Sequence, residues 1–264
     1  MVLNMLAFYS PELQKFRQLE KLNTLMNVDK YKQYPTYSNS INQSFYNVEA
    51  KNIVLNFGMG SEKTSETIIY MKERLRVEPT LKVLVITPNI TLSRGIYYRL
   101  NKMGLNFEHY NEEYKNKATS NKKLKTEMSK ASKLIVCINS LHYSNENRFD
   151  IIICDEIETT LNKWFDNKTL NDNQIKSIES WHNFNDLFKQ SQKNIFLDAL
   201  TTNLSLDYIS SLRDKSNTTE NLDLKIFQRL EEKTDKQIIN IDKFNQWLQL
   251  IIFTLKKNLK VLIY

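Results

Sequence analysis

The sequence predicts an α/β fold in which a mainly parallel sheet is flanked by helices. From Val48 onward, short apolar runs alternate with amphipathic stretches, which is the pattern of a parallel α/β sheet. The runs are almost continuously apolar, as is typical of strands that are buried on both faces. We therefore expect strands at residues 53–56, 83–87, 134–138, 151–154 and 195–197.

Between and after these strands the pattern predicts helices. We expect them at residues 65–76, 92–103 and 175–190, with a charged, exposed segment at 112–130. After Asp198 we expect a helix at 204–212, strands at 224–227 and 237–241, and a helix at 244–257. Residues 1–45 combine a helical pattern with a stretch rich in Tyr, Ser and Asn, and we interpret them as an appendage. The predicted domains are therefore 1–45, 46–241 and 242–264.

Composition places the chain among soluble globular proteins with a basic bias. The formal net charge is +7, which favours nucleic acid as a partner, although interleaved lysines and acids would also produce a solvated basic surface. Cys137 and Cys154 lie inside apolar runs, so we expect buried free thiols in a reducing compartment. No run is long enough for a membrane span, and no leader pattern is present. We expect an intracellular protein.

Two of only four glycines, Gly58 and Gly60, lie in the stretch NFGMGSEKTSE at residues 56–66. An apolar run precedes the stretch and a helical pattern follows Lys63 and Thr64, which is the context of a phosphate-binding loop. In such a loop, backbone amides and the helix N-terminus face the phosphates, the lysine reaches the β and γ phosphates, and the threonine binds Mg²⁺. The predicted nucleotide-binding residues are Gly58, Met59, Gly60, Ser61, Glu62, Lys63 and Thr64.

The loop departs from the common pattern at two positions. Phe57 stands at the first glycine and Glu62 at the last, where a small residue lets the phosphate approach. We expect the Glu62 carboxylate to weaken nucleotide binding. An ordinary strand, turn and helix junction is the alternative interpretation.

Asp155 and Glu156 follow the apolar run at 151–154, at the end of a strand where open α/β sheets bind their ligands. We expect Asp155 to bind the Mg²⁺ of a nucleotide, and Glu156 to orient and deprotonate an attacking water. Two acids after a strand could also serve only as a helix N-terminal cap.

Four segments in this order, FGMGSEKT, TPNITLSRGIYYRL, CINSLH and CDEIETTL, resemble the first motor domain of superfamily 2 helicases. The resemblance is to the herpesvirus-type origin-binding protein helicases of large DNA viruses, and it covers roughly residues 52–202. It implies a RecA-like P-loop domain that uses ATP and Mg²⁺, with Lys63 and Glu156 as catalytic residues. It also implies nucleic-acid contacts from Thr87, Pro88, Arg94, Ser140 and His142, and coupling through Glu158 and Asp198.

Each of these positions has a simpler interpretation. Thr87 and Pro88 could only end a strand, Arg94 could be a solvent-facing helix residue, and Asp198 could be a strand-end cap. His142 could be an ordinary surface or capping histidine. We expect the three tryptophans, Trp164, Trp181 and Trp247, to pack in the core or on helices.

The resemblance implies an ATP-dependent DNA helicase or translocase motor in viral or plasmid DNA replication. The implied partners are single-stranded DNA, a second motor domain in cis and replication proteins, in the cytoplasm, at a viral replication site or in the nucleus. Residues 260–264 would then begin the second domain. Because of Glu62, an alternative interpretation is a degenerate motor fold that only binds nucleic acid or protein. A P-loop kinase or simple NTPase is a further alternative.

Overall fold

The computed structural model describes residues 35–38, 45–58, 61–115, 120–144, 148–165, 174–199, 201–212 and 223–229. All of them belong to one compact unit, residues 1–230. The elements expected at 237–241 and 244–257, the strand at 260–264 and the N-terminal helical pattern lie outside the described residues. The predicted domain boundaries therefore stay predictions.

The described strands form one eight-stranded sheet with the order β1-β8-β2-β7-β6-β3-β5-β4. Every neighbouring pair is parallel, so the predicted parallel sheet is confirmed. The strands are β1 Pro35–Ser38, β2 Asn52–Asn56, β3 Val83–Thr87, β4 Glu108–His109, β5 Lys133–Cys137, β6 Ile151–Asp155, β7 Lys193–Asp198 and β8 Leu224–Arg229.

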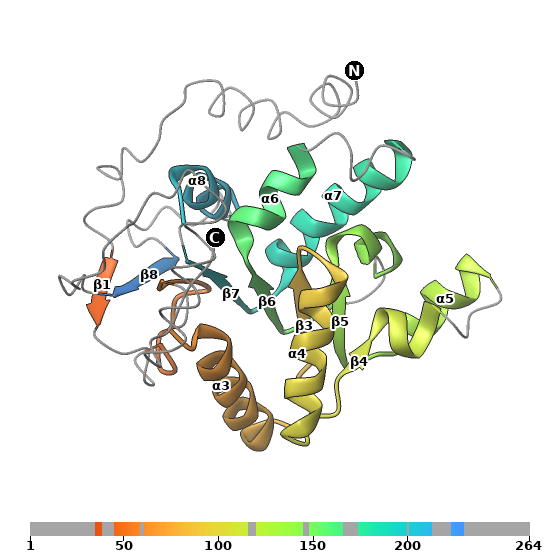
Figure 1. The fold of residues 1–264 in the computed structure, drawn as a ribbon, viewed down its shortest axis with the longest axis horizontal. Coiled ribbons are helices and arrows are strands. Elements are labelled where there is room, and N and C mark those ends of the chain that lie inside the picture. Colours follow the sequence, from red (N-terminus) through yellow and green to blue (C-terminus); the bar gives the residue numbers. More distant parts are fainter. Residues whose placement is uncertain are drawn as a thin grey trace, which may run out of the picture. The chain divides into compact units, whose positions relative to one another are not determined.

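Helices cover both faces of the sheet (Figure 1). The helices α3 Lys63–Val77 and α4 Ile90–Lys102 lie on one side, and α6 Ile157–Phe165, α7 Gln174–Gln190 and α8 Asn203–Ser211 lie on the other. Alternate strand residues point to opposite faces. Ile53 and Leu55 therefore pack in the α3 and α4 layer, whereas Val54 packs in the opposite layer.

The charged segment expected to be exposed at 112–130 is partly buried. It forms the π-helical segment η2 Tyr110–Lys115 and the helix α5 Asn121–Met128. Tyr114, Leu124 and Met128 are buried in the same core layer as Leu134 of β5. These few apolar residues are spaced so that one side of the segment reaches the sheet while the charges stay outside.

The strand registers bring the ends of several strands to one edge of the sheet. Asn56 pairs with Asp198 across β2 and β7, and Asp155 pairs with Leu197 across β6 and β7. Thr87 pairs with Cys137 across β3 and β5. Because all strands run in the same direction, the loops that follow them emerge together at this carboxyl edge.

Two more sequence expectations concern buried groups and membrane spans. Cys137 and Cys154 are free and buried, as predicted. In the part of the chain that the structure describes, no helix is both long and apolar enough to cross a bilayer.

An aromatic cluster joins α6, α7 and α8 on one face of the sheet. Trp164 and Trp181 are buried, which confirms their predicted core role, and Trp247 lies outside the described residues. The ring of Trp181 lies 5.4 Å from that of Trp164, 6.0 Å from Phe184 and 5.7 Å from Tyr208. Rings at these separations pack against one another beyond simple burial.

We predict that Trp181→Ala lowers the free energy of unfolding by about 3–5 kcal/mol, because it leaves a large cavity among three helices. Urea denaturation followed by circular dichroism measures the change. Tyr98→Ala is the control, since Tyr98 is 62% exposed and should change stability by less than about 0.5 kcal/mol. An equal effect of the two substitutions would contradict the packing role of Trp181.

Candidate functional site

The loop between β2 and α3 begins with a buried residue where the common motif has glycine. Phe57 packs in the same core layer as Leu55 and Met71, and its amide donates to the Asp198 carbonyl at 3.2 Å. The Ser61 amide donates to the Gly58 carbonyl at 3.3 Å. Phe57 therefore fastens the start of the loop to the core and to β7. Met59 and Gly60 lie outside the described residues.

Glu62 precedes the first residue of α3 and adopts the left-handed conformation, with φ 63° and ψ 18°. Glycine reaches this conformation without strain, so the position keeps the backbone shape of the motif although it lacks the glycine. The Glu62 side chain is exposed and makes no cap hydrogen bond to the helix. The Glu62 carboxylate is therefore solvated in this structure.

Lys63 is buried, and its ammonium group contacts backbone carbonyls of the loop that precedes α3. Its Nζ atom donates to the carbonyls of Phe57 and Gly58, the latter at 3.2 Å. Burial lowers the pKa of the Lys63 amine, while the carboxylates of Glu156, Asp155 and Asp198 act in the opposite direction. The lysine is thus placed among acidic side chains from two strand ends.

Asp155 is 3% exposed at the end of β6. Burial raises its pKa to about 7, the neighbouring Glu156 adds to the rise, and Lys63 opposes it. Glu156 has φ 56°, and burial followed by the charge of Asp198 raises its pKa as well. Thr64 and Asp155 both border a small cavity in the core whose lining is otherwise mostly apolar. Residues of the two motifs therefore lie close together.

The acids at the site are not a complete metal cage. Among the described residues, no group of three or more His, Cys, Asp or Glu side chains is arranged to hold a metal ion. Mg²⁺ in nucleotide sites takes one or two carboxylates together with phosphate oxygens and water, and does not need such a cage. Thr64 and Asp155 fit that smaller set. The Ser61 hydroxyl is also buried and has no hydrogen-bond partner within the described ranges.

Glu158 connects the start of α6 to the loop after β7. Its amide donates to Asp198 Oδ2 at 2.8 Å. Its carboxylate accepts from the Thr202 amide at 3.2 Å, from Thr202 Oγ1 at 2.8 Å and from Ser205 Oγ. Asp198 therefore accepts a hydrogen bond from a backbone amide in the first turn of α6, which is a capping role. Asp198 ends β7, whereas α6 follows β6. Thr202 and Ser205 carried no signal of this role in the sequence.

Two residues of the predicted nucleic-acid segment after β3 are buried. Thr87 Oγ1 donates to the Asn89 carbonyl at 3.0 Å, and the Pro88 carbonyl accepts from Lys163 Nζ at 2.5 Å. Lys163, on α6, was not among the predicted site residues. It ties the segment after β3 to the helix that follows the acidic pair.

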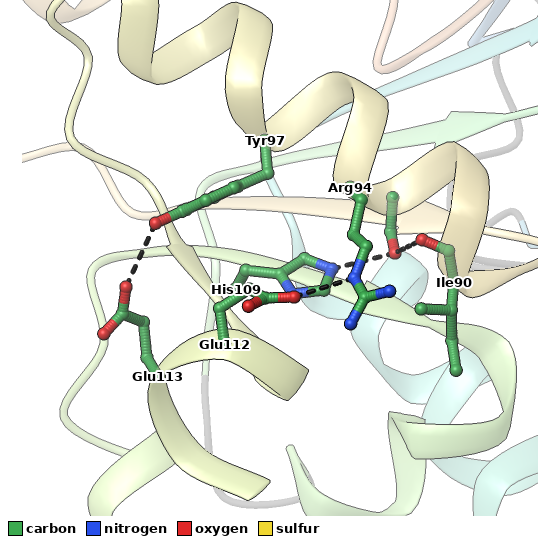
Figure 2. Close-up of polar contacts among 7 residues, drawn as sticks. Ile90, Arg94, Tyr97, His109, Glu112 and Glu113 are labelled. Carbon is green, nitrogen blue, oxygen red and sulfur yellow. Dashed lines mark hydrogen bonds and ion pairs between the residues drawn. The ribbon is translucent and has the colours of Figure 1, made fainter. Parts of the chain in front are cut away.

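Arg94 is the predicted nucleic-acid residue that lies at the surface. Its side chain is 51% exposed, and its Nε lies 2.7 Å from Glu112 Oε1 (Figure 2). Ser140 and His142, on the 3-10 helix η3 Ile138–Tyr143, are 6% and 7% exposed. The ring of His142 lies 3.9 Å from that of Tyr143. Of the five predicted contacts, Arg94 alone presents an exposed cation.

One comparison with known proteins identifies a family. A model of the family described as origin of replication binding protein matches residues 8–220. A comparison with curated protein sequences finds no match.

Three of the solved structures with some similarity are an ATPase core, a DEAD box protein and a hypothetical RNA helicase. The SWI2/SNF2 ATPase core of Sulfolobus solfataricus, in complex with dsDNA, has a TM-score of 0.45 and 17% identity over 62% of this chain and 32% of that one. A DEAD box protein from Methanococcus jannaschii has a TM-score of 0.45 and 15% identity, over 67% of this chain and 45% of that one. A hypothetical ATP-dependent RNA helicase from Sulfolobus tokodaii has a TM-score of 0.45 and 15% identity, over 81% of this chain and 56% of that one. This chain thus spans between 32% and 56% of their lengths.

We predict that Glu62→Gly stabilises the chain by about 1 kcal/mol, because it removes the strain of a side chain in the left-handed region. The free energy of unfolding in urea measures this. Glu62→Ala is the matched control, since it removes the carboxylate and keeps the strain, and it should leave stability nearly unchanged. A gain of the same size with alanine would show that charge, and not backbone conformation, sets the effect.

Proposed function

The chain belongs to the origin of replication binding protein family, and from this premise we propose that it is the ATP-dependent motor domain of a DNA helicase or translocase that acts in viral or plasmid replication. One observation carries the proposal. Lys63 at the start of α3 interacts electrostatically with Asp155, Glu156 and Asp198 at the ends of β6 and β7. This supports the proposal that the phosphate loop and the acidic pair act as a single site at the carboxyl edge of the sheet.

The residues of this site fit ATP with Mg²⁺. The N-terminus of α3, without a cap from the Glu62 side chain, leaves helix amides for phosphate oxygens. Thr64 and Asp155 would hold the Mg²⁺, which supplies neutralisation of charge on the phosphates. Gly58, Met59, Gly60 and Ser61 would surround the phosphates.

Lys63 and Glu156 would be the catalytic residues. The Lys63 ammonium would leave the carbonyls of its own loop and bind the terminal phosphate oxygens, where it offsets negative charge. Glu156 would orient the attacking water and accept its proton. A base works best when its pKa is close to the working pH, and burial moves the pKa of Glu156 upward in that direction.

Asp198 and Glu158 would transmit the state of the site. They link the end of β7, the start of α6 and the start of α8 through the hydrogen bonds of Glu158. A shift of Glu156 on loss of the terminal phosphate would therefore move the loop at Thr202. We propose this loop as the coupling element.

Nucleic acid would bind beside the nucleotide site, at the surface of α4. Arg94 would contact phosphate, and the buried Thr87, Pro88, Ser140 and His142 would shape the two segments after β3 and β5. Phosphate contacts dominate sequence-tolerant binding, and the net charge of +7 favours it. The proposed partners are single-stranded DNA, a second motor domain in cis and replication proteins, inside the cell.

A degenerate motor that binds without turnover is the second candidate. The observation that favours it is the Lys63 ammonium, which is hydrogen-bonded to Phe57 and Gly58 carbonyls of its own loop. A loop closed in this way must open before phosphate binds. Turnover distinguishes this candidate from the motor.

We predict that the full gene product hydrolyses ATP faster with single-stranded DNA, and that Glu156→Gln lowers turnover by about 10²–10⁴-fold without weakening nucleotide binding. Lys63→Ala should weaken binding as well. Steady-state hydrolysis and calorimetric titration separate the two effects. Hydrolysis that is absent in the wild type, with nucleotide still bound, would favour the degenerate motor, and hydrolysis that both variants retain would refute the assigned site.

A further inference from the structure

One short segment of the chain contacts three side chains of α4 (Figure 2). The segment runs from His109, at the end of β4, to Glu113 in η2. The contacts are Ser93 Oγ with His109 Nε2 at 2.8 Å, Arg94 Nε with Glu112 Oε1 at 2.7 Å and Tyr97 OH with Glu113 Oε1 at 3.1 Å. The surface of α4 that would meet nucleic acid is therefore already in contact with acidic side chains.

The Ser93 contact fixes the segment at its buried end. Ser93 Oγ donates to the Ile90 carbonyl at 2.8 Å, so it accepts the proton of His109 Nε2. Ser93 and His109 are each 1% exposed, and burial lowers the pKa of His109, which favours the neutral ring. A buried hydrogen bond of this kind helps to set where Glu112 lies, because Glu112 follows His109 by three residues in η2.

The Arg94 contact is the exposed one. The side chain of Glu112 is 31% exposed and that of Arg94 51%, and ion pairs at such exposure are weak. The helix α4, with the sequence ITLSRGIYYRLNK, contains cations and no acid, whereas η2 has glutamates at its third and fourth positions. The Glu112 carboxylate accepts the hydrogen bond from Arg94 Nε–H that a phosphate oxygen could otherwise accept.

We propose that Glu112 is a built-in competitor for nucleic acid at Arg94, an inference that rests on the proposed nucleic-acid function. Bound phosphate displaces the Glu112 carboxylate from Arg94, while the buried bond of His109 keeps the segment in place. The pair lowers, by the same factor, the affinity of every strand that binds Arg94, because each must first displace Glu112.

The test is the affinity of residues 1–264 for a fluorescently labelled oligothymidylate at low salt. Glu112→Gln keeps the shape of the side chain and removes its charge, and it should tighten binding by about two- to fivefold. Glu73→Gln is the matched control, because Glu73 also pairs with an arginine Nε, that of Arg76 on α3 at 3.2 Å. The two variants change net charge equally, so their difference reports the location of the freed arginine.

Arg94→Ala and the double variant Arg94→Ala with Glu112→Gln complete the experiment. The double variant should bind no tighter than Arg94→Ala, because the gain passes through Arg94. Circular dichroism confirms folding, and Glu112→Ala is the second variant, with the same expected gain. Equal affinities of Glu112→Gln and Glu73→Gln would overturn the role of Glu112 but not the proposed function. A double variant that binds more tightly than Arg94→Ala would do the same. Absence of oligonucleotide binding by the wild type and every variant would overturn it together with the proposed function.

Discussion

The burial of charge at the ends of β6 and β7 is the constraint on which the rest of this site depends. Asp155 is almost fully buried. Burial, and then the charges of Glu156 and Asp198, raise its pKa and oppose its ionisation, whereas Lys63 and Arg99 favour the ionised form. Removing an ionised carboxylate from water is costly unless an opposite charge compensates it. Even with Lys63 and Arg99 nearby, the pKa of Asp155 is raised to about 7, and a bound divalent cation would favour its ionised form.

The fold places these charges through backbone pairing. The parallel registers of β2, β7 and β6 pair Asn56 with Asp198 and Asp155 with Leu197, so Asp155 lies within one residue of the level of Asp198. Phe57 then anchors the loop to the core and to the Asp198 carbonyl, so Lys63 enters α3 beside the acids. An ordinary core residue in place of glycine thus contributes rigidity to the loop, while Glu62 keeps the left-handed turn that glycine would allow.

Much of the fold follows from apolar runs that are buried on both sides, and β3 at Val83–Thr87 agrees with its expected range. The edge strands escaped prediction for physical reasons. The two-residue β4 contains Glu and His and has no apolar run, and β1 begins with proline, which edge strands tolerate. The position of Lys63, Asp155 and Glu156 at one edge of the sheet was predictable, because each follows an apolar run that forms a parallel strand. The partners of Glu158 and Arg94 were not, because Thr202 and Glu112 reach them only through tertiary packing.

The most direct test is thermal unfolding of the wild type and Asp155→Asn, each with and without Mg²⁺ and a non-hydrolysable ATP analogue. Because burial raises the pKa of Asp155 to about 7, the folded chain binds this proton more tightly than the unfolded chain, and ionisation opposes folding between about pH 4 and 7. Without nucleotide, Asp155→Asn should therefore be more stable than the wild type at pH 7, by on the order of 1 kcal/mol. With Mg²⁺ and the analogue, the wild type should gain stability and the variant should not. A variant that is less stable alone, yet gains as much as the wild type from the ligands, would contradict the account.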